Sequence, residues 1–67
     1  MNNFKNRINL VLKNKKMSQN ELAKKIYMSQ SIVNNYCTGK REPSLEVLIA
    51  ICKALNVSAD YLLGLTD

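Results

Sequence analysis

The stretch SQNELAKKIYMSQSIVNNYC, residues 18–37, contains two helix-start signals close together. Ser18 and Glu21 form a capping box: the serine hydroxyl accepts a hydrogen bond from the Glu21 backbone N–H, and the glutamate carboxylate accepts one from the Ser18 N–H. Ser29 is a second N-cap residue of the type that helices prefer. The stretch therefore predicts two short helices and a connecting turn, over residues 18–25, residues 29–37 and residues 26–28.

The second of these helices has two chemically different faces. At about 100° per residue, its apolar side chains fall on one side. The other side carries uncharged amides and hydroxyls, namely Gln30, Ser31, Asn34, Asn35 and Thr38. Lys40 and Arg41 follow just past the helix, so charge is kept off the helix and placed beside its end.

The rest of the chain also has helical periodicity. A stripe that begins at Phe4 predicts a helix over residues 3–15, with Leu10 off the stripe and exposed. Ser44 caps a helix whose apolar residues cover more than half of its circumference, which predicts a central helix that contacts several neighbours. A short helix over residues 58–63 ends at Gly64. We therefore expect an all-α fold of five helices in a single domain, residues 1–67.

The charge of the chain is unevenly distributed. The net charge is +5 over 67 residues. Residues 1–41 contain nine Lys or Arg and one acid, whereas residues 42–67 contain one Lys and four acids. A basic part beside a mildly acidic part indicates a surface that faces a polyanion.

Several functional classes find no support in the composition. The chain has two cysteines and no histidine, and Cys37 and Cys52 lack a zinc-site spacing, so we expect free thiols and no metal. Neither a signal peptide nor an apolar run of membrane-spanning length is visible. We therefore expect a cytoplasmic protein that is not an enzyme, has no cofactor, no membrane contact and no evident small-molecule ligand.

Four segments, in register and without a gap, resemble the phage-repressor and Cro type of helix-turn-helix protein, the Xre family. The resemblance covers about residues 5–65. Each motif is weak alone, but together they are specific. They are the opening SQ-x-ELA (18–23), S-x-S-x-V (29–33), GKR-x-PS (39–44) and LIAICKALNVSADYLLG (48–64).

This resemblance implies a five-helix, lambda-repressor-like DNA-binding domain in which residues 18–37 form the helix-turn-helix. In that class the second helix of the motif enters the major groove, and homodimers bind two half-sites of a palindromic operator. The function implied is that of a sequence-specific DNA-binding transcriptional regulator that acts as a repressor. The apolar residues of the C-terminal part would form the dimer interface, namely Val57, Leu63 and Leu65.

The resemblance also implies roles for individual residues. Base-reading positions correspond to Gln30, Ser31, Asn34 and Asn35. Phosphate-contacting positions correspond to Gln19, Thr38, Lys40 and Arg41. The division has a chemical reason: cations bind any phosphate, whereas an amide can pair with adenine through N6 and N7 and so select a sequence.

The chain departs from the family pattern at two pairs of positions. The family usually has glycine at the end of the first helix and in the turn of the motif, where this chain has Lys16 and Tyr27. Either these residues adopt a left-handed backbone, or the turns are shaped differently. Family members often have a buried Arg–Glu pair where this chain has Leu12 and Cys37, so both charges are replaced together.

A protein-interaction role is the main alternative. The same fold could serve as an antitoxin or as a partner in an anti-repressor complex, and a solvated polar helix face would then explain the amides. A toxin reading frame beside the gene would favour this alternative.

Overall fold

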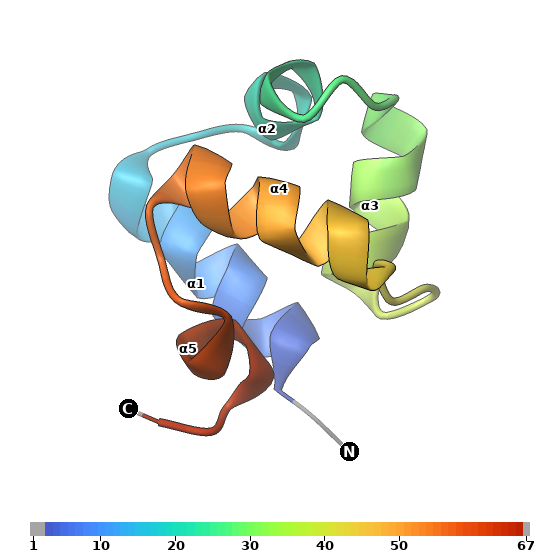
Figure 1. The fold of residues 1–67 in the computed structure, drawn as a ribbon. Helices are drawn as coiled ribbons and strands as arrows, with labels where there is room; N and C mark the ends of the chain where they lie inside the picture. Colours follow the sequence, from blue (N-terminus) through green and yellow to red (C-terminus); the bar gives the residue numbers. More distant parts are fainter. Residues whose placement is uncertain (1–2, 67) are drawn as a thin grey trace.

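The computed structural model describes residues 3–66, which form five helices and no strand (Figure 1). Helices α1 and α4 are the longest, and α5 is a short helix near the C-terminus. The expected all-α architecture is confirmed, and the helix boundaries that the sequence analysis predicts lie within one or two residues of the observed ones. The helices are α1 (Phe4–Lys15), α2 (Gln19–Lys25), α3 (Gln30–Thr38), α4 (Leu45–Leu55) and α5 (Ala59–Leu63).

Serine caps begin four of the helices. Both bonds of the capping box at α2 are present: the Glu21 N–H donates to Ser18 Oγ at 3.0 Å, and the Ser18 N–H donates to Glu21 Oε1 at 2.9 Å. That N–H bond lowers the pKa of Glu21, assisted by the nearby lysines of α2. The other three caps are Ser29, Ser44 and Ser58, whose hydroxyls accept from N–H groups at 3.3, 3.3 and 3.1 Å.

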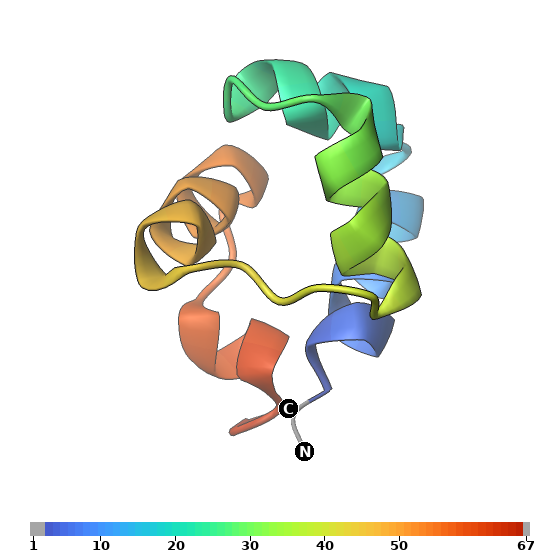
Figure 2. The ribbon, with the colours of Figure 1, turned by 90° about the vertical axis from the view of Figure 1, so that its right-hand side faces the viewer.

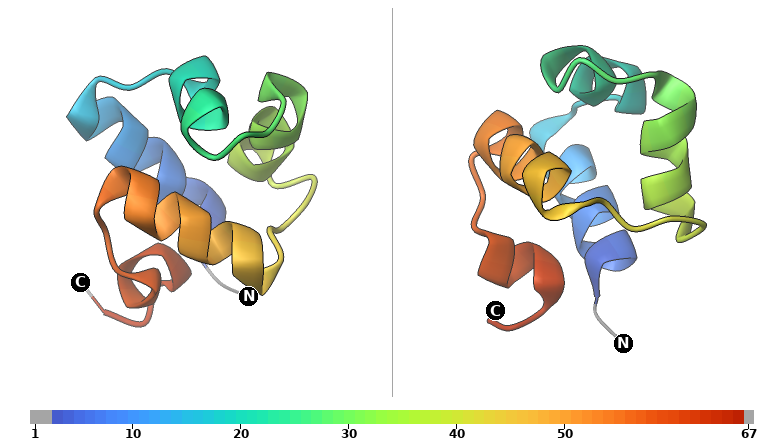
Figure 3. Two further views of the ribbon diagram at one scale, coloured as in Figure 1. Left: turned by 45° about the horizontal axis from the view of Figure 1, so that its top comes forward. Right: turned by 45° about the vertical axis from the view of Figure 1, so that its right-hand side comes forward.

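The core lies between α1 and the other helices. Figure 2 shows α3 on one side of the molecule and α4 on the other, with α2 across the top. Helix α1 contacts both α3 and α5, and Figure 3 shows it running behind α4. The most deeply buried side chains come from every helix, and they are Ile8, Leu22, Val33, Ile51, Leu55 and Leu62.

The outer face of α4 carries exposed apolar side chains. Leu48, Ile51 and Leu55 are buried, but Leu45 and Ile49 are 78% and 55% exposed. Helix α4 contacts α2 and α5, and no other part of residues 3–66 covers the side opposite these buried residues. The predicted contact of α4 with several neighbours is therefore present, but its wide apolar face did not reveal that Leu45 and Ile49 would be exposed.

The Arg7 side chain connects α1 to the C-terminal segment through hydrogen bonds and a contact with an aromatic ring. Its guanidinium lies 4.4 Å from the centre of the Tyr61 ring. The same group donates to the Thr66 carbonyl at 3.0 Å and to the Tyr61 carbonyl at 3.4 Å. This residue therefore fixes the segment that carries Leu63 and Leu65.

Lys16 and Tyr27 both adopt a left-handed backbone, with φ of 54° and 59°. The two turns thus keep the shape for which the family uses glycine, and this chain carries the strain. A left-handed conformation costs a non-glycine residue about 1–2 kcal/mol. The Tyr27 side chain offers no burial in return, because it is 95% exposed.

Replacing Tyr27 by glycine should therefore stabilise the protein. The relief of strain exceeds the extra chain entropy of glycine, which leaves a gain of about 1 kcal/mol or a rise in melting temperature of about 4–8 °C. Thermal unfolding of Tyr27→Gly beside Tyr27→Ala measures it, since the alanine variant keeps the strain. An unchanged or lower melting temperature for the glycine variant would contradict the prediction.

None of the helices in the described part of the chain has the length and apolar character that crossing a membrane requires.

Candidate nucleic-acid interface

Helices α2 and α3 form a helix-turn-helix. The turn between them runs from Ile26 to Ser29, and the Met28 N–H donates to the Ala23 carbonyl at 2.9 Å. The back of α3 packs into the core through Val33, Tyr36 and Cys37. This burial fixes which face of α3 points outward.

The predicted base-reading residues share that outward face. Gln30, Ser31 and Asn34 are exposed, and Asn35 is half-buried. None carries a charge, and the first two lie in the first turn of α3, where the Ser29 hydroxyl caps the helix. The structure thus brings these four side chains together on a surface formed by amides and one hydroxyl. Contact with bases remains a prediction.

Gln19 and Asn34 are joined across the motif. Asn34 Nδ2 donates a hydrogen bond to Gln19 Oε1 at 3.1 Å. The bond connects the first residue of α2 to the outward face of α3. The sequence predicts separate roles for them, a phosphate contact for Gln19 and base reading for Asn34, and does not predict this hydrogen bond.

Thr38 is the last residue of α3, and its hydroxyl is used inside the helix. Oγ1 donates to the Asn34 carbonyl at 2.9 Å and lies 3.4 Å from the Asn35 carbonyl. A phosphate oxygen can only accept a hydrogen bond, so the predicted phosphate contact requires the hydroxyl to leave this arrangement.

The loop after α3 is tied to the helix through one acceptor, the Asn35 carbonyl. The Lys40 and Arg41 N–H groups donate to it at 3.0 and 3.2 Å, and the Gly39 N–H donates to it as well. Gly39 has φ of 81°, a value that favours glycine. Because these N–H groups are used internally, Lys40 and Arg41 have only their exposed side chains to offer a phosphate.

Two residues of α1 also belong to this region, although no sequence motif pointed to them. A Cβ built on Gly39 would lie 3.1 Å from Lys5 Cδ, so the Lys5 stem packs against the end of α3. Asn9 Nδ2 donates to the Lys5 carbonyl and to the Cys37 carbonyl, both at 2.8 Å. Lys5 adds a cation beside the loop, and Asn9 ties α1 to the last turn of α3.

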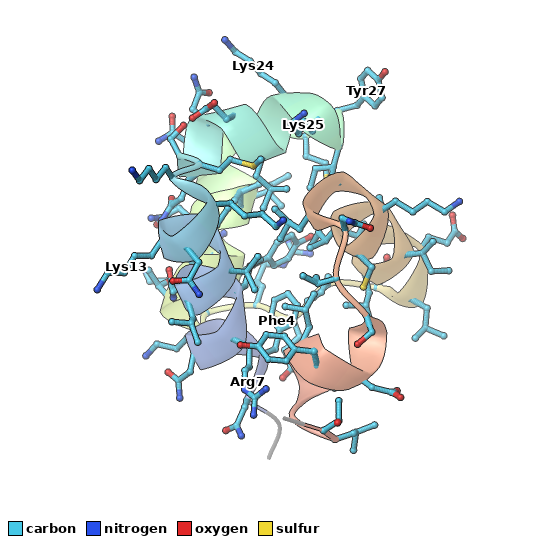
Figure 4. All side chains as sticks on the ribbon, turned by 90° about the vertical axis from the view of Figure 1, so that its left-hand side faces the viewer. Phe4, Arg7, Lys13, Lys24, Lys25 and Tyr27 are labelled. Atoms are coloured by element: carbon cyan, nitrogen blue, oxygen red, sulfur yellow. The ribbon has the colours of Figure 1, made fainter. Side chains whose placement is uncertain are left out.

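Other cations project from α1 and α2. Figure 4 shows Lys24 and Tyr27 projecting from the end of the molecule formed by α2, and Lys13 projecting from α1. These lysines add to the positive charge of the molecule. Within residues 3–66, moreover, His, Cys, Asp and Glu form no group of three or more that could hold a metal ion.

The sequence profile of the helix-turn-helix family matches residues 8–62, so the chain belongs to this family. The chain is 34% identical over 61 residues to the uncharacterized HTH-type transcriptional regulator YobD of Bacillus subtilis (strain 168). It is 41% identical over 51 residues to YqaE, another uncharacterized HTH-type transcriptional regulator of that organism. The matches cover 91% and 76% of this chain but only 54% and 44% of the two relatives, so the chain spans about half of their length.

Solved structures resemble the chain over nearly all of its length. The solution structure of the DNA-binding domain of the P22 c2 repressor has a TM-score of 0.84 at 33% identity, over 100% of this chain and 96% of that domain. A transcriptional regulator from Listeria innocua (TM-score 0.89, 21% identity) matches 100% of this chain and 63% of its own. LexA from Eubacterium rectale (TM-score 0.86, 24% identity) matches 91% of this chain and 65% of its own. The last two likenesses concern the fold alone; together the matches confirm the family resemblance and the five-helix repressor-like fold.

Proposed function

We propose that the chain is a sequence-specific DNA-binding domain of a cytoplasmic transcriptional regulator that acts as a repressor. Helix α3 lies in the major groove, and two copies bind the half-sites of a palindromic operator. The observation that carries the proposal is the outward face of α3, where Gln30, Ser31 and Asn34 are exposed and uncharged while the opposite face is buried. Similarity to the P22 c2 repressor domain over the whole chain supports it.

Different residues would recognise the base sequence and attract the phosphate backbone. Amides on α3 can distinguish base edges in the major groove. Lys40 and Arg41, exposed at the end of α3, and Lys5 beside them supply attraction to phosphate that does not depend on sequence. Gln19 lies at the start of α2, and the N–H groups of its side-chain amide can donate to a phosphate oxygen.

Selection from a pool of random duplexes tests this function. The protein should enrich a two-fold symmetric sequence, and its affinity for that sequence should fall with added salt while its preference over scrambled DNA persists. Enrichment of no sequence, with binding that vanishes at moderate salt, would contradict the proposal.

The proposed function predicts that the protein is a homodimer on DNA. Leu65 is 73% exposed, and Val57 and Leu63, which also belong to the C-terminal part of the chain, are half-buried. Leu65→Glu should weaken dimerisation roughly tenfold or more, as expected when a central apolar contact is lost. Sedimentation with the selected duplex measures it, and Leu10→Glu on the exposed side of α1 is the matched control.

Two outcomes would count against the dimer. One is a footprint of a single half-site with one protein per duplex. The other is equal weakening by Leu65→Glu and Leu10→Glu, which would indicate a general effect of charge.

The alternative, an antitoxin or anti-repressor-type interaction module, has one observation in its favour. Leu45 and Ile49 are exposed on the outer face of α4, where a partner protein would gain apolar contact. This function would be favoured if the protein formed a stoichiometric complex with a partner protein and showed no binding to DNA by itself.

A further inference from the structure

Helix α4 carries exposed side chains that form one stripe along its outer side. At about 100° per residue, they fall within about 100° of the circumference of the helix, on the side away from the core. They are Leu45, Glu46, Ile49 and Lys53. Figures 1 and 2 show α4 at the outside of the molecule, and because these side chains are exposed, no other part of residues 3–66 covers them.

This outer stripe of α4 combines apolar and charged side chains. Leu45 and Ile49 lie one helical turn apart and are 78% and 55% exposed. A single exposed apolar side chain is ordinary on a protein surface. Two of them on adjacent turns, beside an acid and a base, have the pattern of a helix that packs against another helix.

The charges of the stripe lie at opposite ends of α4. Glu46 is in the first turn and Lys53 in the last, about 10 Å apart along the helix axis, so they do not pair with each other. Neither side chain forms an ion pair or a hydrogen bond within residues 3–66. An acid near the start and a base near the end suit the helix dipole. The dipole does not account, however, for the exposed Leu45 and Ile49 beside them.

Antiparallel pairing of two copies of α4 would match each charge with its opposite. The midpoint between Glu46 and Lys53 falls at Ile49 and Ala50. A two-fold axis at this level places Glu46 of each copy opposite Lys53 of the other, and it brings the two Ile49 side chains together. A two-fold contact uses the same patch on both copies, so the patch must be self-complementary. The outer stripe of α4 meets this requirement.

A shallow hollow beside the C-terminal half of α4 strengthens the positive end of the stripe. It has a volume of about 480 Å³, and both Lys25 and Lys53 line it. No acidic residue of the described part of the chain lines this hollow. An acid from another molecule is therefore favoured at this end, and Glu46 of a second copy supplies one.

We propose that the outer stripe of α4 binds a second copy of this chain, with the two α4 helices antiparallel and Ile49 at the two-fold axis. The contact shares no residue with the C-terminal dimer interface predicted from Val57, Leu63 and Leu65, or with the outward face of α3. It is therefore independent of DNA binding, and together with the C-terminal contact it would join dimers into tetramers. One helix from each copy buries less than about 1,200 Å² in total, so the association is weak and depends on concentration.

Charge reversal tests the pairing of Glu46 with Lys53. The variants are made in the Leu65→Glu background, which removes the C-terminal contact, and self-association is measured by sedimentation from micromolar to millimolar concentration. The background protein should dimerise. Glu46→Lys or Lys53→Glu should weaken this dimer roughly tenfold, because like charges then face each other. The double variant should recover most of the loss, because exchanging both charges leaves the stripe self-complementary.

Cross-linking tests the position of the two-fold axis. A cysteine at position 49 would face its own copy, within the distance that a disulfide spans. Ile49→Cys in a Cys52→Ser background should therefore form a disulfide-linked dimer under mild oxidation. Leu10→Cys in the same background is the matched control, since Leu10 is also exposed, at 44%, but lies on α1. Thermal unfolding of all variants checks that the fold is retained.

Three results would overturn the proposal. One is a Leu65→Glu protein that stays monomeric at millimolar concentration, which would leave the stripe to a different partner. Another is a double charge variant that associates as weakly as the single reversals. The third is cross-linking through position 49 that is no faster than cross-linking through position 10. None of these measurements includes DNA, so failure of the proposed function would be evident separately, as the absence of sequence preference.

Discussion

Cys37→Glu should destabilise the protein by about 3–5 kcal/mol, because it places an unpaired carboxylate in the core. Cys37 is 4% exposed, and burial raises the pKa of its thiol, so its surroundings already disfavour negative charge. Against an expected total stability of roughly 3–10 kcal/mol, the loss is severe. Chemical unfolding measures it, with Cys37→Gln as a control of equal size and no charge.

Leu12→Arg should recover much of that loss in the double variant. Leu12 is 5% exposed and belongs to the same buried cluster as Cys37, and α1 and α3 pack together. We predict that the two side chains are in contact, so that an Arg and a Glu there would restore the family's ion pair. Equal stabilities of Cys37→Glu and Cys37→Gln, or no recovery by Leu12→Arg, would disprove the pairing.

The pH dependence of Cys37→Glu follows from the same argument. Burial raises the folded-state pKa of the new carboxyl above its unfolded value of about 4.3. The penalty for charge is therefore absent below the unfolded pKa and grows as pH rises toward the folded pKa. The single variant should differ least from Cys37→Gln at about pH 4.

Gln30→Ala and Lys40→Ala should impair DNA binding in different ways. Gln30 is exposed in the first turn of α3, where a major-groove helix meets base edges, so its loss should cost about 1–3 kcal/mol on the selected duplex, mostly as relaxed preference at one base pair in each half-site. Lys40 lies past the helix, so its loss should weaken binding to all duplexes and reduce the salt slope by about one unit.

Salt titrations on selected and scrambled duplexes distinguish the two effects. Lys24→Ala is the matched control, since it removes one charge from a side chain that projects from α2. If Gln30→Ala lost affinity equally on both duplexes with a shallower salt slope, Gln30 would be a phosphate contact and not a base reader.

Local signals made the helices predictable. A serine cap acts on N–H groups within a few residues, so the starts of α2 through α5 followed directly from Ser18, Ser29, Ser44 and Ser58. The two faces of α3 followed from its period, as the burial of Val33 and Tyr36 confirms. Lys16 and Tyr27 needed the structure, because the sequence left open whether a non-glycine residue would carry the strain.

Contacts between distant segments were beyond sequence reasoning. The bonds from Asn9 to the Cys37 carbonyl and from Asn34 to Gln19 join surface amides of different helices. Nothing in the type or spacing of an amide specifies its partner, which is set by how the helices pack. The exposure of Leu45 and Ile49 has the same origin, since hydrophobicity alone does not say whether another helix is available to cover them.

The shared acceptor at Asn35 has a consequence for kinetics. Three N–H groups converge on that carbonyl, so the start of the loop with Lys40 and Arg41 is ordered before any partner arrives. On the proposed function, encounter with DNA then needs no slow rearrangement of this segment, and the association rate is governed by diffusion and by attraction between opposite charges. The ionic strength of the solution, rather than an internal motion of the protein, would set how quickly it finds its site.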